Sequence, residues 1–348
     1  MSGGLPSKPI DGVLGGLAWL GKRGTGAVAG SIFVGMALPQ LAEFFRPLLP
    51  SAIVGMLILA LLRIDFQGVK YRLGRWRSLG LAVLWSMALL PLACGLLLKF
   101  TGFAASDPDL ALGIYIMVAS PPAMAVAGLA AIMRLDYALS VILVMMCTMA
   151  TPLLSPGIAG LSLGTALPLD AAALALRLGL ILAGSSLATM VLRRLAGPAA
   201  IRRNDDRING AYVVILFVFA VASMDGVALA FWERPALAFA ILAAVFALAL
   251  GQIGLTMLVF VRLQGLQAFT IALLTGLRNM GIFVAAFGAA LPEKAFLFFA
   301  IGQFPIYLLP FLLRSVGGRL SSAIGAAPMV TDIGNDSDSG SGSGRQKE

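Results

Sequence analysis

The chain alternates between long apolar runs and short polar connections. Ten of the runs approach the length of about 20 residues that a helix needs to cross the hydrocarbon core of a bilayer. They comprise residues 25–43, 48–64, 79–99, 110–133, 137–158, 171–192, 208–229, 235–261, 267–290 and 294–316. The pattern predicts an all-α integral membrane protein with ten transmembrane helices.

Two of these runs are interrupted near their middle. The fourth contains Ser120-Pro121-Pro122, and the ninth contains Thr-Gly-Leu-Arg-Asn-Met-Gly at 275–281. A broken helix leaves backbone N–H and C=O groups unpaired, which hydrocarbon cannot satisfy, so a break persists only where protein or water surrounds it. Paired breaks in corresponding runs are typical of the binding site of a secondary transporter.

The basic residues predict how the runs are oriented. With the N-terminus in the cytoplasm, nineteen of the 25 Lys and Arg residues fall in inner segments, and Arg177 and Arg278 lie within runs. The remaining four lie in outer connections: Arg46, Lys99, Arg234 and Lys294. This bias follows the positive-inside rule and predicts that both termini are cytoplasmic.

An arginine-rich linker at 193–207 divides the ten runs into two sets of five. Because five is odd, the second set enters from the opposite side. The halves are then related as an inverted repeat in which helices 4 and 9 are broken and cross. The expected segments are a cytoplasmic N-terminal segment at 1–24, a transporter domain at 25–320 with repeats at about 25–158 and 171–316, and a disordered cytoplasmic tail at 321–348.

Composition excludes several other classes of protein. Hydrophobic residues make up 59% of the 348 and charged residues 12%, against about a quarter charged in soluble domains. The net charge of +9 comes from basic residues between apolar runs, so it indicates topology rather than nucleic-acid binding. Cys94 and Cys147 lie inside runs and indicate no disulfide framework and no metal site. With no histidine and no Asp or Glu in a run interior, we expect no enzyme, no cofactor and no proton coupling through a side chain.

The residues at the breaks indicate how a ligand is held. Pro121 and Pro122 suit the first turn of a new helix, so the half-helix 123–133 is expected to aim its N–H groups into the membrane middle. Gly276 and Gly281 allow the second break to turn sharply. The candidate substrate-binding residues are Arg278, Asn279, Thr275, Ser120, Pro121, Pro122 and Ala123.

Arg278 places a permanent cation inside the second break. A carboxylate would be its usual partner, yet the Asp and Glu residues fall only near the ends of runs. Three alternatives stay open: a substrate carboxylate, sulfonate or phosphate; backbone carbonyls at the break; or snorkelling to the interface. Arg177 lies about two helical turns inside its run, so its side chain is expected to reach the outer interface.

These motifs resemble the bile acid:sodium symporter family, which belongs to the larger group of bile-acid, arsenite and riboflavin transporters. The resemblance covers roughly residues 25–320. Ala-Ser-Pro-Pro-Ala-Met at 119–124, with Asp-Tyr-Ala-Leu-Ser-Val at 136–141, is similar to the family's first crossing and the start of its next helix. Gly-Leu-Arg-Asn-Met-Gly at 276–281 is similar to its second crossing. The resemblance implies a panel domain and a core domain, alternating access between them, and sodium-coupled uptake.

Most side chains that hold sodium in the family are replaced in this chain. The replacements are Val126-Ala127 for Ser-Asn, Leu274 for Glu, Arg278 for Gln, Ser86 for Gln and Val144 for Thr. Sodium prefers about five or six hard oxygens, and here hydrocarbon and a fixed positive charge take their place. The comparison therefore disfavours sodium and makes Arg278 a built-in cation. Ser86 and Ser140 are then possible remnants of an ion site, and Asn279 is the better substrate contact.

The leading hypothesis is a secondary transporter of a small organic anion, working by alternating access in the inner (plasma) membrane of a bacterium. Sodium-coupled uptake of the bile-acid type is the alternative within this class. A non-transporting receptor or scaffold built on a transporter fold is the alternative from another class. The expected partners are the organic anion and the lipid bilayer, with no nucleic acid, and the oligomeric state stays open.

Overall fold

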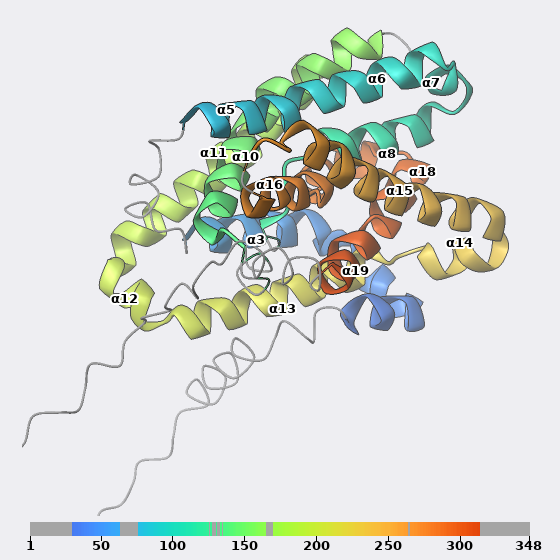
Figure 1. Ribbon diagram of the computed structural model, residues 1–348. Coiled ribbons are helices and arrows are strands. Elements are labelled where there is room, and N and C mark those ends of the chain that lie inside the picture. Colours follow the sequence, from blue (N-terminus) through green and yellow to red (C-terminus); the bar gives the residue numbers. More distant parts are fainter. Residues whose placement is uncertain are drawn as a thin grey trace, which may run out of the picture.

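The computed structural model describes residues 30–62, 76–124, 126, 130, 133, 135–164, 170–263 and 265–313 (Figure 1). In this part of the chain the regular structure is helical, and the pairing of β type is an antiparallel bridge between Pro122 and Arg278. The predicted all-α class is therefore confirmed.

Six helices among the described residues are long and apolar enough to cross a membrane. They are Pro39–Leu62 (α2 Pro39–Phe45, the 3-10 turn η1 Arg46–Leu48 and α3 Leu49–Leu62), Ser78–Phe100 (within α5 Trp76–Leu84, the π-helical turn η3 Trp85–Leu89 and α6 Leu90–Phe100), α10 Tyr137–Ser162, α11 Ala171–Ala196, Asp205–Glu233 (α13 Asp205–Ser223 and α14 Val227–Glu233) and α15 Pro235–Val259. Their length and apolar composition fit a membrane protein.

The remaining helices are shorter. Three apolar segments cannot cross a bilayer alone: α8 Pro108–Ala119, α16 Gly265–Gly276, and α17 Gly281–Phe287 with the 3-10 turn η5 Gly288–Ala290. The others are residues 30–37, α7 Phe103–Ser106, α12 Pro198–Arg203, α18 Glu293–Ile301 and α19 Gln303–Leu312. Both predicted interruptions, in the fourth and ninth runs, are thus present, whereas the ten-helix inverted repeat stays a prediction.

The expected boundary between the first two runs, at residues 44–47, is wrong. The helix is instead interrupted at Leu38, whose backbone leaves the helical region (φ −123°, ψ 74°). Pro39 begins α2, and a proline disfavours helical backbone in the residue before it. From Pro39 onward the helix runs without a gap to Leu62, so the polar residues near position 46 end the apolar pattern but not the helix.

The tenth run, expected as one helix at 294–316, is divided at Gly302 between α18 and α19. A Cβ at Gly302 would lie 3.1 Å from Sδ of Met280 and 3.0 Å from the carbonyl oxygen of Phe298. Both contacts are tighter than most Cβ contacts, so a side chain here would require its neighbours to shift by a few tenths of an ångström. The division therefore lets the C-terminal helices pack directly against the second break.

Large apolar side chains cover the outside of the long helices. Leu153 and Leu161 of α10 and Leu195 of α11 are 79%, 78% and 79% exposed. Water solvates such surface poorly, whereas hydrocarbon solvates it well. These faces fit contact with lipid.

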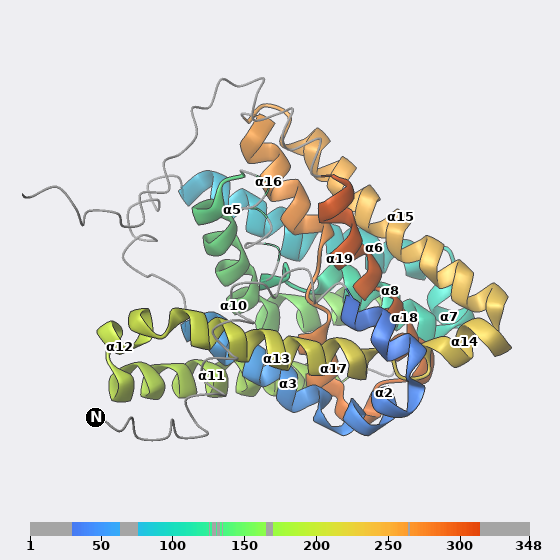
Figure 2. The ribbon, with the colours of Figure 1, turned by 90° about the horizontal axis from the view of Figure 1, so that it is seen from below.

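The segments that contain the breaks are enclosed by the long helices. α16 packs along α15 and against α10, α17 packs against α3 and α11, and α18 packs against α8. Figures 1 and 2 show this arrangement from two directions, with the facing ends of α8 and α16 near the middle of the molecule.

Charged side chains at helix ends join different parts of the chain. Arg193 donates from Nη2 to the carbonyl oxygens of Leu61 (3.1 Å) and Leu62 (2.8 Å). Exposed ion pairs add little stability, about 0–1 kcal/mol each, but they show which parts of different helices lie close together. The described pairs are Arg46 with Asp225, Arg234 with Glu293 (3.4 Å) and Lys294 with Asp107 (2.6 Å).

Gly276→Ala tests the close approach of α16 to α15. A Cβ on Gly276 would lie 2.4 Å from Cγ1 of Ile253 and 2.7 Å from the backbone carbonyl oxygen of Ala249, which cannot move away easily. We expect the free energy of unfolding to fall by about 1–3 kcal/mol, as in other overpacked cores. Thermal unfolding in detergent measures the change. The control is Gly254→Ala on α15, where nothing lies within 4 Å of the added Cβ; an equal loss in both variants would contradict the close approach.

Candidate functional site

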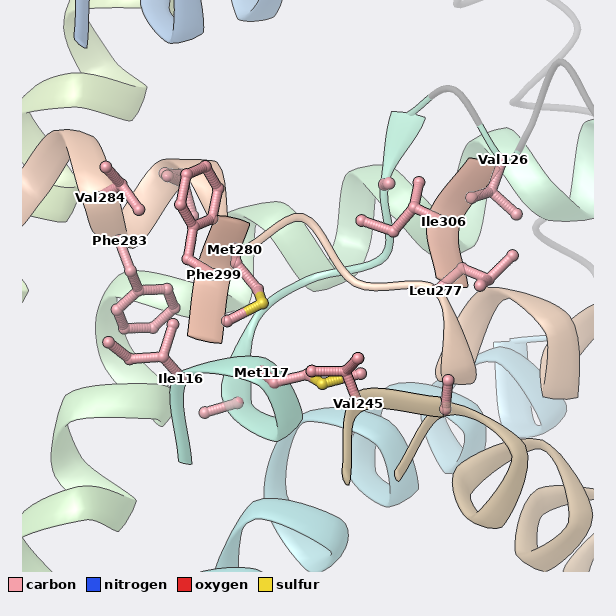
Figure 3. Packing of buried hydrophobic residues seen from close by; sticks show 14 of the residues in the cluster. Ile116, Met117, Val126, Val245, Leu277, Met280, Phe283, Val284, Phe299 and Ile306 are labelled. Atoms are coloured by element: carbon pink, nitrogen blue, oxygen red, sulfur yellow. The ribbon is translucent and has the colours of Figure 1, made fainter. Parts of the chain in front are cut away.

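Both interrupted runs unwind at the same place in the fold. α8 ends, and Ser120 takes an extended backbone (φ −70°, ψ 150°). α16 ends at Gly276, and α17 begins at Gly281. Figure 3 shows the two unwound stretches passing each other among buried apolar side chains that include Leu277 and Met280.

Backbone hydrogen bonds join the two stretches into a crossing. The Ala123 N–H donates to the Leu277 carbonyl oxygen (2.9 Å), and the Asn279 N–H donates to the Pro121 carbonyl oxygen (2.7 Å). Each break thus satisfies backbone groups of the other, which removes much of the cost of unwinding inside a membrane. Of the N–H groups that the half-helix 123–133 was expected to aim into the membrane middle, that of Ala123 is used within the crossing, and several residues of this half-helix lie outside the described residues.

The neighbouring side chains of Arg278 and Asn279 in the second stretch contact different parts of the fold. Arg278 is 1% exposed and points toward η3 and α15. Asn279 is partly exposed, and its Oδ1 lies with Ile53 of α3 and Phe219 of α13 around Gly281. The crossing therefore has a buried cation on one side and an accessible amide on the other.

Four neutral oxygens accept hydrogen bonds from Arg278, and we call them the guanidinium cage. Nη1 donates to Oγ of Ser86 and to the carbonyl oxygen of Ser120, both at 2.9 Å. Nη2 donates to the carbonyl oxygen of Ser86 at 3.0 Å, and Nε donates to Oε1 of Gln252 at 3.2 Å. Among the described residues the partners include no carboxylate, so dipoles hold the charge without neutralising it. Of the alternatives left open by the sequence, the structure shows contact with protein oxygens rather than snorkelling.

A local change of helix register makes the Ser86 carbonyl available. In η3 the Leu90 N–H donates to the carbonyl oxygen of Trp85, five residues back. In an ordinary α-helix that N–H would donate to Ser86 instead. The next residue, Pro91, has no N–H to offer in the shifted register. The Ser86 carbonyl oxygen is therefore left for Arg278.

The other predicted site residues are buried in the crossing or bonded within their own segment. Pro121, Pro122 and Ala123 are buried in the crossing. Three hydroxyls donate to the carbonyl four residues back: Thr275 to Ile271 (2.8 Å), Ser120 to Ile116 (2.6 Å) and Ser140 to Asp136 (2.8 Å). Of the two expected ion-site remnants, Ser86 belongs to the cage, whereas the hydroxyl of Ser140 is used locally.

Arg177 lies on α11, apart from the cage. Its Nη1 donates to the carbonyl oxygen of Ala286, in the last turn of α17, at 3.4 Å. A cation at this position is favourable because the final carbonyls of a helix carry partial negative charge. Whether Arg177 also reaches the membrane interface stays a prediction.

Gln252 of α15 is the cage residue that the sequence did not single out. Its Oε1 accepts from Arg278, and its buried Nε2 has no partner among the described residues. A glutamine inside an apolar run is a usable signal, since a buried amide needs several hydrogen bonds. One turn further along α15, Oγ1 of Thr256 accepts from Nε1 of Trp85 at 2.9 Å. The η3 turn and α15 are thus joined beside the cage as well as through it.

The cage does not fit a sodium ion together with Arg278. Sodium takes about five or six hard oxygens, and the four oxygens of the cage already accept from the guanidinium. Within the described ranges, no group of three His, Cys, Asp or Glu residues could hold a metal ion. The geometry therefore suits one fixed cation.

Pro91→Ala tests how the Ser86 carbonyl is kept for Arg278. Alanine supplies the missing N–H, so η3 can return to α-helical register and the Leu90 N–H can take the Ser86 carbonyl. We expect the free energy of unfolding to fall by about 1 kcal/mol or more, because a charged donor loses its acceptor. Thermal unfolding in detergent measures it. The control is Pro156→Ala, at a proline inside α10 that is not part of the cage, and its free energy of unfolding should stay the same or rise. A rise in the free energy of unfolding of both variants would contradict the role of Pro91.

Neither a family of proteins nor a curated protein matches this chain. What the site does must therefore follow from its own geometry and charge.

Proposed function

We propose that the chain is a secondary transporter that carries a small organic anion across a membrane by alternating access and without sodium. The observation that carries this proposal is a buried guanidinium beside the crossing of two broken helices. Crossings of this kind are where secondary transporters place substrate and co-ion. The resemblance to the bile acid:sodium symporter family supports the same class.

Contacts between helix ends support the ten-helix topology. Arg193 contacts the carbonyl oxygens of Leu61 and Leu62, and the topology places all three at the inner side. Two described ion pairs join residues that it places at the outer side: Arg234 with Glu293 and Lys294 with Asp107. An error of one span between any two partners would put them on opposite faces of the bilayer. The consistency favours ten spans and, with them, the five-plus-five inverted repeat.

The packing also divides the helices into two groups, and the proposed mechanism moves one group against the other. The crossing fastens the end of α8 to the stretch between α16 and α17, so these segments move together. The side chain of Asn279 lies on the side of this body that faces α3 and α13. We assign α3, α11 and α13 to the panel domain and the helices around the crossing to the core domain. Alternating access then consists of motion of the core against the panel.

Arg278 takes the place of a coupling ion in this proposal. Neutral oxygens from backbone, hydroxyl and amide are the ligands that alkali and other hard cations use in proteins. Here such oxygens surround a cation that is covalently part of the chain. A cation that cannot dissociate removes the need for sodium to complete the site.

The charge of Arg278 accounts for the preference for an anion. Its partners are neutral, and the surrounding core screens a charge much less than water does, so its field extends to the accessible side of the crossing. In the proposal, Asn279 makes the direct polar contact with the anion, because its amide is partly exposed and makes no hydrogen bond to a described side chain. Arg278 thus attracts the substrate at a distance, and Asn279 binds it.

Replacing sodium with choline tests the proposed ion independence. Proteoliposomes are assayed with a panel of radiolabelled carboxylates, sulfonates and bile acids, and uptake should proceed at the same rate in both salts. Arg278→Gln leaves the cage oxygens without a cation, so its uptake should fall and recover only with sodium. Sodium-dependent uptake by the unaltered chain would refute the proposal. Stabilisation by a solute without any flux would favour the receptor alternative.

Asn279→Ala tests the direct contact with the substrate. Loss of one hydrogen bond to an anion should raise KM about tenfold and leave thermal unfolding nearly unchanged. Thr275→Val, which removes a hydroxyl already bonded to Ile271, is the control and should keep its KM. If the two variants behave alike in the uptake assay, Asn279 does not contact the substrate.

A further inference from the structure

A groove of about 490 Å³ lies where α11 leads into α13, on the short helix α12 between them. Its walls are Ala199, Ala200, Arg203, Asn204, Asp206 and Arg207. α11 and the helix that begins at Asp205 are both long and apolar enough to span a membrane, so the groove lies at a membrane surface. Figures 1 and 2 show α12 at one extremity of the molecule, away from the crossing.

Two guanidinium groups belong to the groove. Arg203 and Arg207 line it and are exposed, and Nη1 of Arg207 is held by Oδ1 of Asn204 at 2.8 Å. Arg194 and Arg202 are exposed close by in the chain but are not among the lining residues. The positive-inside rule accounts for arginines in this linker. It does not account for two of them lining one groove together with an amide.

The helix that precedes the groove carries exposed apolar side chains. Leu187, Val191 and Leu195 are 63%, 45% and 79% exposed and recur every four residues, so they share one face of α11. Ala199 and Ala200 are the apolar residues that line the groove itself. A ligand that matches the whole surface has an anionic head and a hydrocarbon tail.

We propose that the groove binds the headgroup of an anionic phospholipid. The phosphate lies between Arg203 and Arg207, since guanidinium groups pair with phosphate oxygens through charge-assisted hydrogen bonds. The glycerol backbone lies over the two alanines, and the acyl chains follow the exposed face of α11. Asp206 accepts a hydrogen bond from a hydroxyl of the headgroup. This site is independent of the proposed transport activity.

Thermal unfolding of the purified full-length protein in detergent, titrated with phosphatidylglycerol or phosphatidylcholine, tests the site. Phosphatidylglycerol should raise the unfolding midpoint more than phosphatidylcholine does. In the double variant Arg203→Gln, Arg207→Gln, the lipid concentration for half of this effect should rise about thirtyfold, because two basic side chains no longer attract the lipid. The charge-matched control Arg194→Gln, Arg202→Gln should stay close to the unaltered chain.

Several outcomes would overturn the proposal. If both double variants lose the effect of phosphatidylglycerol equally, the lipid is attracted to the basic surface in general. If phosphatidylcholine stabilises the protein equally, the groove does not distinguish an anionic headgroup from a zwitterionic one. Stabilisation by soluble glycerol phosphate at the same concentration would assign the site to a free phosphate ester. If the groove variant does not fold, native mass spectrometry of the unaltered chain decides: it should retain phosphatidylglycerol over phosphatidylcholine, and equal retention refutes the site.

Discussion

The centre of this fold depends on the burial of one guanidinium group among neutral oxygens. Arg278 binds Ser86 on η3, Ser120 at the end of α8 and Gln252 on α15, so three separate elements meet at one side chain. Burying an ion costs several kcal/mol unless polar groups surround it. Because each element supplies part of that surrounding, displacing any one would leave a buried charge short of a partner, and the elements are coupled.

The sequence predicted the breaks, and it predicted the partners of Arg278 only in part. Consecutive prolines after Ser120 and the glycines on either side of Arg278 are local signals, so the two unwound stretches could be read from the chain itself. Backbone carbonyls at the break were among the expected partners, and Ser86 was expected as a remnant of an ion site. That Ser86 and Gln252 both bind Arg278 could not be predicted, because they lie 192 and 26 residues away on helices whose rotation no local pattern fixes. The register shift in η3 depends on a single hydrogen bond to the carbonyl oxygen of Trp85. The division of the helix at Leu38 depends on the proline that follows this residue.

The second break also separates two residues that the sequence placed together. Arg278 and Asn279 were expected side by side at a ligand, but Arg278 contacts η3 and α15, whereas Asn279 lies beside α3 and α13. Only Asn279 is accessible, while Arg278 is enclosed. In the proposed function, contact with the anion and the positive charge are therefore provided by different residues. This division would let the site attract an anion without holding it too tightly, since a direct ion pair in a dry core is hard to break.

In the proposed transporter, a cation that is part of the protein changes how the membrane voltage acts on the transported anion. A co-transported sodium ion would cancel the charge of a monovalent anion, whereas a guanidinium that never leaves its cage cancels nothing across a complete cycle. Each anion then crosses as a net charge, and the voltage contributes about 2.3 kcal/mol per elementary charge for every 100 mV. With the cell interior negative, this term pushes an anion outward. In the proposed transporter, movement of the anion past Arg278 therefore carries net charge across the membrane, and the voltage favours its outward direction.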